Sequence, residues 1–346
     1  MTFSFFSIIP DRGRFILCRL LMCSLILCFP SAVYAGLASP LSVSNQSPLV
    51  QIHGLPAMGR ALLLPDGQLE SELSIDVTSH FIRQQHGSET LLLDGESYRY
   101  ALRFAYGCGD RLEIGLELPY LRHTAGQLDS FIDDWHDVFS LPTAGRENVP
   151  VDQLLFFYER SGMQDLALTQ TSEGLGDLRL NAAWQLQDES GAGTTAIALH
   201  GSLKLPTGES EKLTGSGGLD VALWLSAARQ RRVSWGNLTL LGSLGLLALG
   251  DGDVLRGQQR SLVGFGGLGF ALQPWQRVRL QIQADFHSSF YDQSHLRGVD
   301  SASLQLATGG ALTFGKADEL ELAVVEDLSS DTAPDVVFHA AWRHRF

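Results

Sequence analysis

DVVFHAAWRHRF, residues 335–346, is the stretch that decides the fold predicted from this sequence. Five of its apolar residues share one parity: Val336, Phe338, Ala340, Trp342 and Phe346. The other parity carries His339, Ala341, Arg343 and Arg345. Successive side chains of a β-strand point to opposite faces, so the pattern predicts a strand with one apolar face and one charged face.

The predicted strand ends on an aromatic residue, Phe346, four positions after Trp342. A terminal aromatic of this kind resembles the signal that the assembly machinery of bacterial outer-membrane barrels reads. Trp342 and Phe346 are therefore candidate assembly residues, and that machinery is an expected partner. A barrel also requires that the rest of the chain supplies strands until the sheet closes.

The same alternation recurs from Gln68 to the C-terminus. It marks twelve segments, at about 68–81, 98–106, 112–118, 178–186, 197–205, 219–225, 237–249, 261–273, 278–286, 304–314, 320–324 and 336–346. Alternating segments of about ten residues, separated by turn residues, are typical of outer-membrane barrels. The sequence thus predicts an all-β protein, an antiparallel transmembrane barrel of about twelve strands at 68–346. Between 237 and 273 glycines blur the facing, so the strand count there stays open.

The connections alternate long and short along the chain. The longest, 122–176, is interpreted as an extracellular loop, and 82–97 as a shorter one. Short periplasmic turns and longer outer loops produce this rhythm when both termini are periplasmic and the strand number is even. Closure would place Glu70 and Glu72 near Arg343 and Arg345, with Glu319 and Glu321 on the other side of the same arginines.

The residues before the barrel divide into two parts. Residues 1–35 combine arginines, an apolar run and a Ser-Ala-Val-Tyr-Ala ending, which predicts a cleaved export signal. Residues 36–67 contain too much Pro and Gly for a regular element. They form either a periplasmic lead-in or a plug in the lumen, and the sequence leaves both open.

Composition supports a membrane location. The chain carries a net charge of −13, and removal of residues 1–35 makes the rest two units more negative, which argues against nucleic-acid binding. Only Cys108 lies outside the export signal, so no internal disulfide is expected. No apolar run is long enough for a spanning helix, so the membrane would be crossed by strands. The expected surroundings are the lipid and lipopolysaccharide of a Gram-negative outer membrane.

The long loop contains the pattern FIDDWHDVFSLP at 131–142, whose aromatic and aliphatic residues have helical spacing. This predicts one short helical insertion, and 151–160 is a second amphipathic candidate. The candidate loop site comprises Asp133, Trp135, His136 and Asp137. Its acids and histidine suit a divalent cation, but a helix whose apolar stripe packs on the barrel rim and whose acids face water is the preferred explanation, so metal binding stays unknown.

Catalysis finds little support in the sequence. Asn181, His200 and Ser202 resemble the triad of outer-membrane phospholipase, but all three fall on the polar parity and so point into the lumen, away from lipid. No nucleophile elbow, zinc-protease motif or phosphate-binding loop is present. The expectation is that the protein is not an enzyme and needs no cofactor.

The polar face is the better functional surface. The predicted lumen-lining residues are Arg99, Arg103, Arg111, Glu113, Glu117, Arg179, Lys204, Arg277, Arg279, Asp285, Glu319, Glu321, Arg343 and Arg345. About eight strands enclose only side chains and porins need sixteen or more, so twelve is intermediate. The favoured function is a narrow or gated channel for small or hydrophobic solutes. The alternative is a closed structural or surface-binding barrel, and a hydrolase is a remote third.

Four short motifs also carry a family resemblance: Asn45–Pro48, Phe131–Pro142, Gly174–Leu178 and Lys204–Gly208. Together they resemble an uncharacterised family of proteobacterial outer-membrane proteins, known as a domain of unknown function, over the whole chain after the export signal. The resemblance implies a barrel and supplies neither a substrate nor catalytic residues. The last two motifs also resemble pieces of barrels thought to pass hydrophobic compounds.

Overall fold

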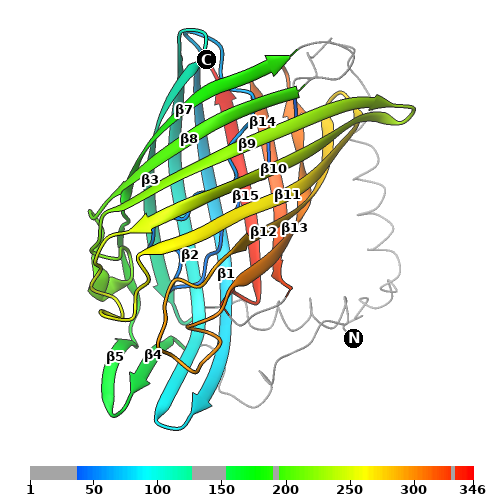
Figure 1. The fold of residues 1–346 in the computed structure, drawn as a ribbon. Helices are drawn as coiled ribbons and strands as arrows, with labels where there is room; N and C mark the ends of the chain where they lie inside the picture. Colours follow the sequence, from blue (N-terminus) through cyan, green and yellow to red (C-terminus); the bar gives the residue numbers. More distant parts are fainter. Residues whose placement is uncertain (1–36, 127–152, 190–194, 329–331) are drawn as a thin grey trace, which may run out of the picture. The chain divides into compact units, whose positions relative to one another are not determined.

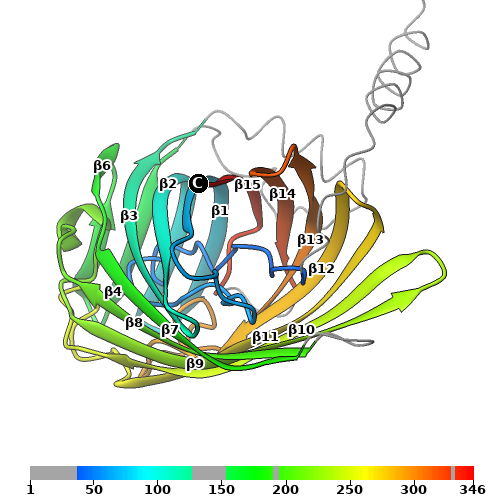
Figure 2. The same cartoon turned by 90° about the horizontal axis from the view of Figure 1, so that it is seen from above.

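The computed structural model describes residues 37–126, 153–189, 195–328 and 332–346. Within them, twelve antiparallel strands close into a barrel (Figures 1 and 2), which confirms the predicted fold. These strands are β1 (Leu69–His86), β2 (Glu89–Cys108), β3 (Leu112–Thr124), β7 (Leu178–Glu189), β8 (Thr195–Leu205), β9 (Asp220–Val233), β10 (Gly236–Leu249), β11 (Leu262–Trp275), β12 (Val278–His287), β13 (Ser303–Phe314), β14 (Asp318–Asp327) and β15 (Val336–Arg345). Residues 37–67 are called the N-terminal segment below.

The barrel closes where its first strand pairs with its last. β15 lies antiparallel to β1, with Glu70 opposite Arg345 and Glu72 opposite Arg343, as the sequence predicted. The amide of Phe346 donates to the carbonyl oxygen of Leu69 (2.9 Å), so the pairing continues to the C-terminus. A closed sheet leaves no strand edge exposed, which a membrane requires because lipid cannot satisfy backbone hydrogen bonds.

The two faces of the wall differ as the alternation requires. Outward-facing side chains such as Leu73, Leu280 and Ile282 are exposed, whereas Ser74 and Gln281, their chain neighbours, are buried. The glycine-rich region that blurred the sequence pattern forms two full strands, β10 and β11, paired from Asn237–Gln273 to Ala248–Leu262. The strand count there is therefore two.

The predicted long loop at 122–176 contains strands that the sequence did not predict. They are β4 (Leu155–Arg160), β5 (Met163–Leu168) and β6 (Ser172–Leu175). The amphipathic helix expected at 151–160 is wrong, because β4 pairs with β2 instead. Phe156 and Tyr158 are fully buried on one face of β4, with period two rather than helical spacing.

The connection expected at 82–97 is also mostly strand, since only Gly87 and Ser88 separate β1 from β2. β1 follows one edge of β2 throughout, whereas on the other edge the partner changes at Gly95, from β3 (paired with Glu96–Cys108) to β4 (paired with Glu89–Asp94). Gly95 has a φ of 143°, and a Cβ there would lie 2.9 Å from the Leu154 side chain. Only glycine fits this conformation without strain, so it allows the β1–β2 hairpin to extend beyond the wall.

Regular helix is scarce in the described ranges, where the short 3-10 turn Ser210–Lys212 is the helical element. None of these residues forms a helix long and apolar enough to cross a membrane. The helical insertion predicted at 131–142 lies outside the described residues. So does the whole of the predicted export signal, 1–35.

The N-terminal segment lies inside the barrel (Figure 2). The Leu41 amide donates to the side chain of Gln283, midway along β12 (2.9 Å). The chain then turns at 48–53, and the Gly67 amide donates to the carbonyl oxygen of Gly107 (3.0 Å). Gly107 lies at the end of the barrel that carries the C-terminus and the short turns, called the short-turn rim; the opposite end is the long-loop rim. The segment therefore turns inside the lumen and returns to the short-turn rim.

The turn at 48–53 belongs to one apolar cluster near the long-loop rim. The cluster, called the apolar cap, joins the turn to β2, β4, the inner faces of β9–β11 and three connecting loops. Its members include Leu49, Val50, Ile52, Leu55, Leu91, Leu93, Phe156, Tyr158, Leu213, Leu247, Leu249, Val254, Leu255, Phe265, Phe290, Tyr291, Leu296 and Val299. Burial of each large side chain contributes roughly 1.5–3 kcal/mol, so the turn is held mainly by apolar packing.

Candidate functional site

The structure places most of the predicted lumen-lining residues on the inner wall. Those buried are Arg99, Glu117, Arg179, Lys204, Glu321 and Arg343. Those half-buried are Arg103, Glu113, Arg277, Arg279, Asp285 and Glu319. Arg111 and Arg345, near the short-turn rim, are exposed. Buried charges need opposite charges and hydrogen bonds, so their partners determine what this wall does.

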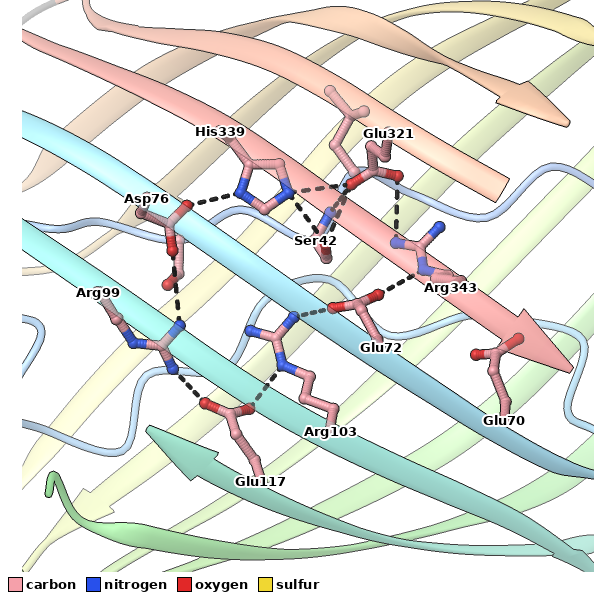
Figure 3. Close-up of polar contacts among 12 residues, drawn as sticks. Ser42, Glu70, Glu72, Asp76, Arg99, Arg103, Glu117, Glu321, His339 and Arg343 are labelled. Carbon is pink, nitrogen blue, oxygen red and sulfur yellow. Dashed lines mark hydrogen bonds and ion pairs between the residues drawn. The ribbon is translucent and has the colours of Figure 1, made fainter. Parts of the chain in front are cut away.

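One group of charges joins β1, β2 and β3 (Figure 3). Arg99 pairs with Glu117 and lies 3.6 Å from Asp76. Arg103 binds the other carboxylate oxygen of Glu117 (2.9 Å) and pairs with Glu72. Each guanidinium thus bridges two carboxylates on neighbouring strands, and the three strands are linked across their inner face.

A second group crosses the closing pair of strands. Arg343 on β15 pairs with Glu72 on β1 and binds Glu319 on β14 (2.8 Å), and its Nη2 lies 3.1 Å from Glu321. His339 lies between Asp76 (Nδ1 to Oδ1, 2.6 Å) and Glu321 (Nε2 to Oε1, 3.4 Å). Glu72 is shared by both groups, so the network is continuous over the seam.

The same wall binds the backbone of the N-terminal segment. The Ser42 amide donates to Glu321 (2.8 Å), and the Leu64 amide donates to Glu113 (2.9 Å). Arg60 pairs with Glu70 near the short-turn rim. Carboxylates of the wall therefore hold a segment that belongs to no strand.

Arg60 and the seam also enclose a cavity of about 180 Å³ between the segment and the wall. Its charged lining includes Arg60, Glu70, Glu72, Arg103, Glu113 and Arg343. Acids and bases alternate around it, so it suits water or a small dipolar solute better than a single ion.

A separate polar cluster holds the turn of the segment. Lys204 binds Asp177 (2.6 Å), Asp220 (3.1 Å) and the Ile52 carbonyl oxygen (3.1 Å), and all of these side chains are buried. The Gly54 amide donates to Asp220 (2.8 Å). A lysine that binds a carbonyl oxygen of the turn fixes the turn against the wall at β8 and β9.

His53 completes this cluster from inside the turn. The Tyr291 hydroxyl donates to the Leu49 carbonyl oxygen (3.0 Å) and therefore accepts from His53 Nε2 (2.8 Å). Burial, helped by the nearby Lys204 ammonium, holds the pKa of His53 well below its usual value. Sequence reasoning identified Lys204 alone among these residues. The others lie up to 242 positions apart and share no periodic signal.

The remaining candidates have simpler environments. His200 stacks on Trp224 (4.9 Å between ring centres) and donates through Nε2 to the Arg60 carbonyl oxygen (3.0 Å). Asn181 lies opposite Ser202 on the next strand, inside the lumen. The loop site Asp133, Trp135, His136 and Asp137 lies outside the described residues. Within the described ranges, no group of three or more His, Cys, Asp or Glu side chains is placed to hold a metal ion.

The comparisons with known proteins agree with this architecture. The sequence model of a protein family of unknown function, DUF3187, matches residues 16–346. The COG4313 outer membrane channel from Pseudomonas putida F1 has a similar structure, with 15% identity, a TM-score of 0.56 and coverage of 82% of this chain and 97% of that chain. At this identity the likeness concerns the fold: the chain is a β-barrel similar to Gram-negative outer membrane channels.

Two further structures are less similar. The CymD monoaromatic hydrocarbon channel shares 10% identity, with a TM-score of 0.38 and coverage of 90% of this chain and 95% of that chain. The toluene transporter TbuX of Ralstonia pickettii shares 12% identity, with a TM-score of 0.32 and coverage of 82% and 90%. No curated protein matches the chain.

Proposed function

Because the chain belongs to the DUF3187 family, whose function is unknown, its role rests on the way its lumen is filled, and we propose that it is an outer-membrane channel closed by its own N-terminal segment. In this proposal the segment acts as a plug, the barrel wall is the pore, and the structure represents the closed state.

The observation that carries the proposal is that a separable segment fills the lumen. The barrel completes its own hydrogen bonding between β1 and β15 and needs nothing from the segment to close. The inner wall also pairs most of its buried charges within itself, as Arg99 does with Glu117. A barrel with a purely structural role would fill its lumen with side chains of the wall, as small barrels do.

The chemistry along the lumen supports small solutes with apolar surface. A solute that enters at the long-loop rim first meets the apolar cap, where Leu49 and Ile52 of the turn pack against Phe290. It then meets the charged wall and its cavity toward the short-turn rim. Small solutes that combine apolar surface with a polar group fit both steps better than ions, which the apolar cap would exclude.

The remaining parts of the proposal follow from the fold. The exposed belt of leucines and aromatic residues on the wall suits outer-membrane lipid and lipopolysaccharide. Trp342 and Phe346 lie on the outward face, exposed at the end of β15, where an assembly factor has access to them. Residues 1–35 are proposed as the export signal that brings the chain to this membrane.

Planar-bilayer recordings of a variant that lacks residues 41–64 test the proposal. We expect stable conductance from this variant and only rare openings from the full chain. A variant that lacks Asp129–Pro142, which lie outside the described residues, is the control for a deletion elsewhere in the chain. Each protein is first shown to fold by its faster migration on a gel when unheated. Absence of conductance and of solute flux in a folded 41–64 deletion would favour the alternative, a closed structural or surface-binding barrel.

A further inference from the structure

Two arginines lie on the lipid-facing side of the barrel wall. Along β9, Val221, Leu223 and Leu225 point outward and are exposed, and the same parity continues to Arg229 and Arg231. Both arginines are exposed near the short-turn rim. The β9–β10 hairpin that carries them projects outward there in both views (Figures 1 and 2). The outward face of β9 is therefore apolar along most of its length and becomes basic near the short-turn rim.

Neither arginine has a carboxylate opposite it. Arg229 pairs across the sheet with Thr195 on β8 and Leu240 on β10, and Arg231 pairs with Leu238. No ion pair joins either arginine to another of the described residues. The contrast is Arg122, outward-facing at the other end of the wall, which has Glu173 at 3.6 Å. Among the described residues, Arg229 and Arg231 therefore have no acidic partner, and their donors can reach a group outside the chain.

Tryptophans mark the same level of the wall. Trp235 in the β9–β10 turn is 62% exposed, and Trp275 at the end of β11 is 60% exposed. Exposed Trp side chains gather where hydrocarbon meets the headgroups, because the ring is apolar and its N–H is polar. Leu240, next to Arg229, is also exposed and suits the hydrocarbon. The arginines thus lie where acyl chains give way to headgroups.

We propose that Arg229 and Arg231 form a binding site for the phosphate of an anionic phospholipid, in the leaflet at the short-turn rim. Guanidinium groups bind phosphate oxygens in pairs, and arginines at the edge of an apolar wall extend toward headgroups. Short turns face the periplasm in barrels of this type, so the leaflet is the inner, phospholipid one. The inference rests on the membrane location proposed above and is independent of channel activity.

Native mass spectrometry of the folded, detergent-purified protein, titrated with phosphatidylglycerol and separately with phosphatidylcholine, tests this site. Each surface arginine is expected to contribute about fivefold to the affinity for an anionic headgroup. Arg231→Ser should therefore weaken phosphatidylglycerol binding about fivefold, and the Arg229→Ser/Arg231→Ser variant considerably more. Phosphatidylcholine binding should stay unchanged in both.

Arg232→Ser is the matched control, because Arg232 is an exposed neighbour of the same charge on the inward parity. If Arg231→Ser and Arg232→Ser weaken phosphatidylglycerol binding equally, the effect depends only on the net charge of the protein, and the proposed site is wrong. Unchanged affinity in the double variant, or tighter binding of diphosphorylated lipid A than of phosphatidylglycerol, would overturn it as well. A wild-type chain that folds in no detergent or vesicle would instead refute the membrane location.

Discussion

Arg343 and Arg345 allow a direct test of the seam, because both lie on β15 and pair with glutamates of β1, yet they differ in burial. The Arg343 side chain is 8% exposed and contacts Glu72, Glu319 and Glu321. The Arg345 side chain is 48% exposed and binds Glu70 (2.8 Å). The perturbation is Arg343→Gln compared with Arg345→Gln, which removes one positive charge in each case.

The expected magnitudes differ severalfold. Removal of one partner from a buried ion pair costs about 3–5 kcal/mol, because the other charge stays buried without compensation. An exposed pair contributes about 0.2–1 kcal/mol. Arg343→Gln should therefore lower the free energy of unfolding by about 3–5 kcal/mol, and Arg345→Gln by less than about 1 kcal/mol. Reversal of both arginines to Glu should destabilise further, and addition of Glu70→Lys and Glu72→Lys should restore part of the loss.

Urea unfolding in phospholipid vesicles, followed by tryptophan emission and by gel migration without heating, gives these free energies. The double variant Glu72→Gln/Arg343→Gln completes a mutant cycle, and we expect its loss to be smaller than the sum of the single losses. Equal, small effects of Arg343→Gln and Arg345→Gln would mean that Arg343 is hydrated and that the charge network does not hold the seam.

Three further predictions concern the turn of the plug. Burial lowers the pKa of His53, so docking favours its neutral form; docking is strongest above the ordinary pKa of about 6.5 and weakens as the pH falls below it. Bilayer conductance should then rise at acid pH in the wild type and stay flat in His53→Gln. Tyr291→Phe leaves the Leu49 carbonyl oxygen without its donor, so docking should weaken by about 1–3 kcal/mol and the open fraction should rise in the same recordings. Leu49→Asp places a charge in the apolar cap and should increase dye entry into cells, whereas Leu62→Asp, at an exposed position of the same segment, should not.

The sequence predicted the barrel well because a membrane wall obeys a simple periodic rule. Each strand exposes one face to lipid, so residues such as Leu280 and Ile282 must alternate with Gln281. The closure pairs of β1 and β15 followed from the same parity together with the antiparallel geometry. Glycines obscured the alternation in β10 and β11, because a residue without a side chain does not indicate which face of the strand is apolar.

The unpredicted parts are those that no periodicity governs. β4 contains the run Leu-Phe-Phe-Tyr, apolar on both faces, so its alternation could not be read and a helix was predicted instead. The cluster around Lys204 contains His53, Asp220 and Tyr291. These residues are far apart in the sequence and become neighbours only in the folded chain. The N-terminal segment has no regular structure, and its place in the lumen depends on apolar contacts and on backbone amides, neither of which follows a sequence period.

The central claim is that the N-terminal segment closes the pore, and a reversible tether tests it most directly. A Cβ added at Gly54 would lie 2.9 Å from the Cβ of Asp220, close to the roughly 3.5–4.5 Å of a disulfide, so Gly54→Cys and Asp220→Cys can join the turn to β9. Cys108 is replaced by Ser, and Gly54→Cys alone is the control. Single-channel recordings before and after reduction should show no conductance in the oxidised pair and openings once the bond is reduced. An oxidised, fully cross-linked pair that conducts as the reduced form does would contradict the claim.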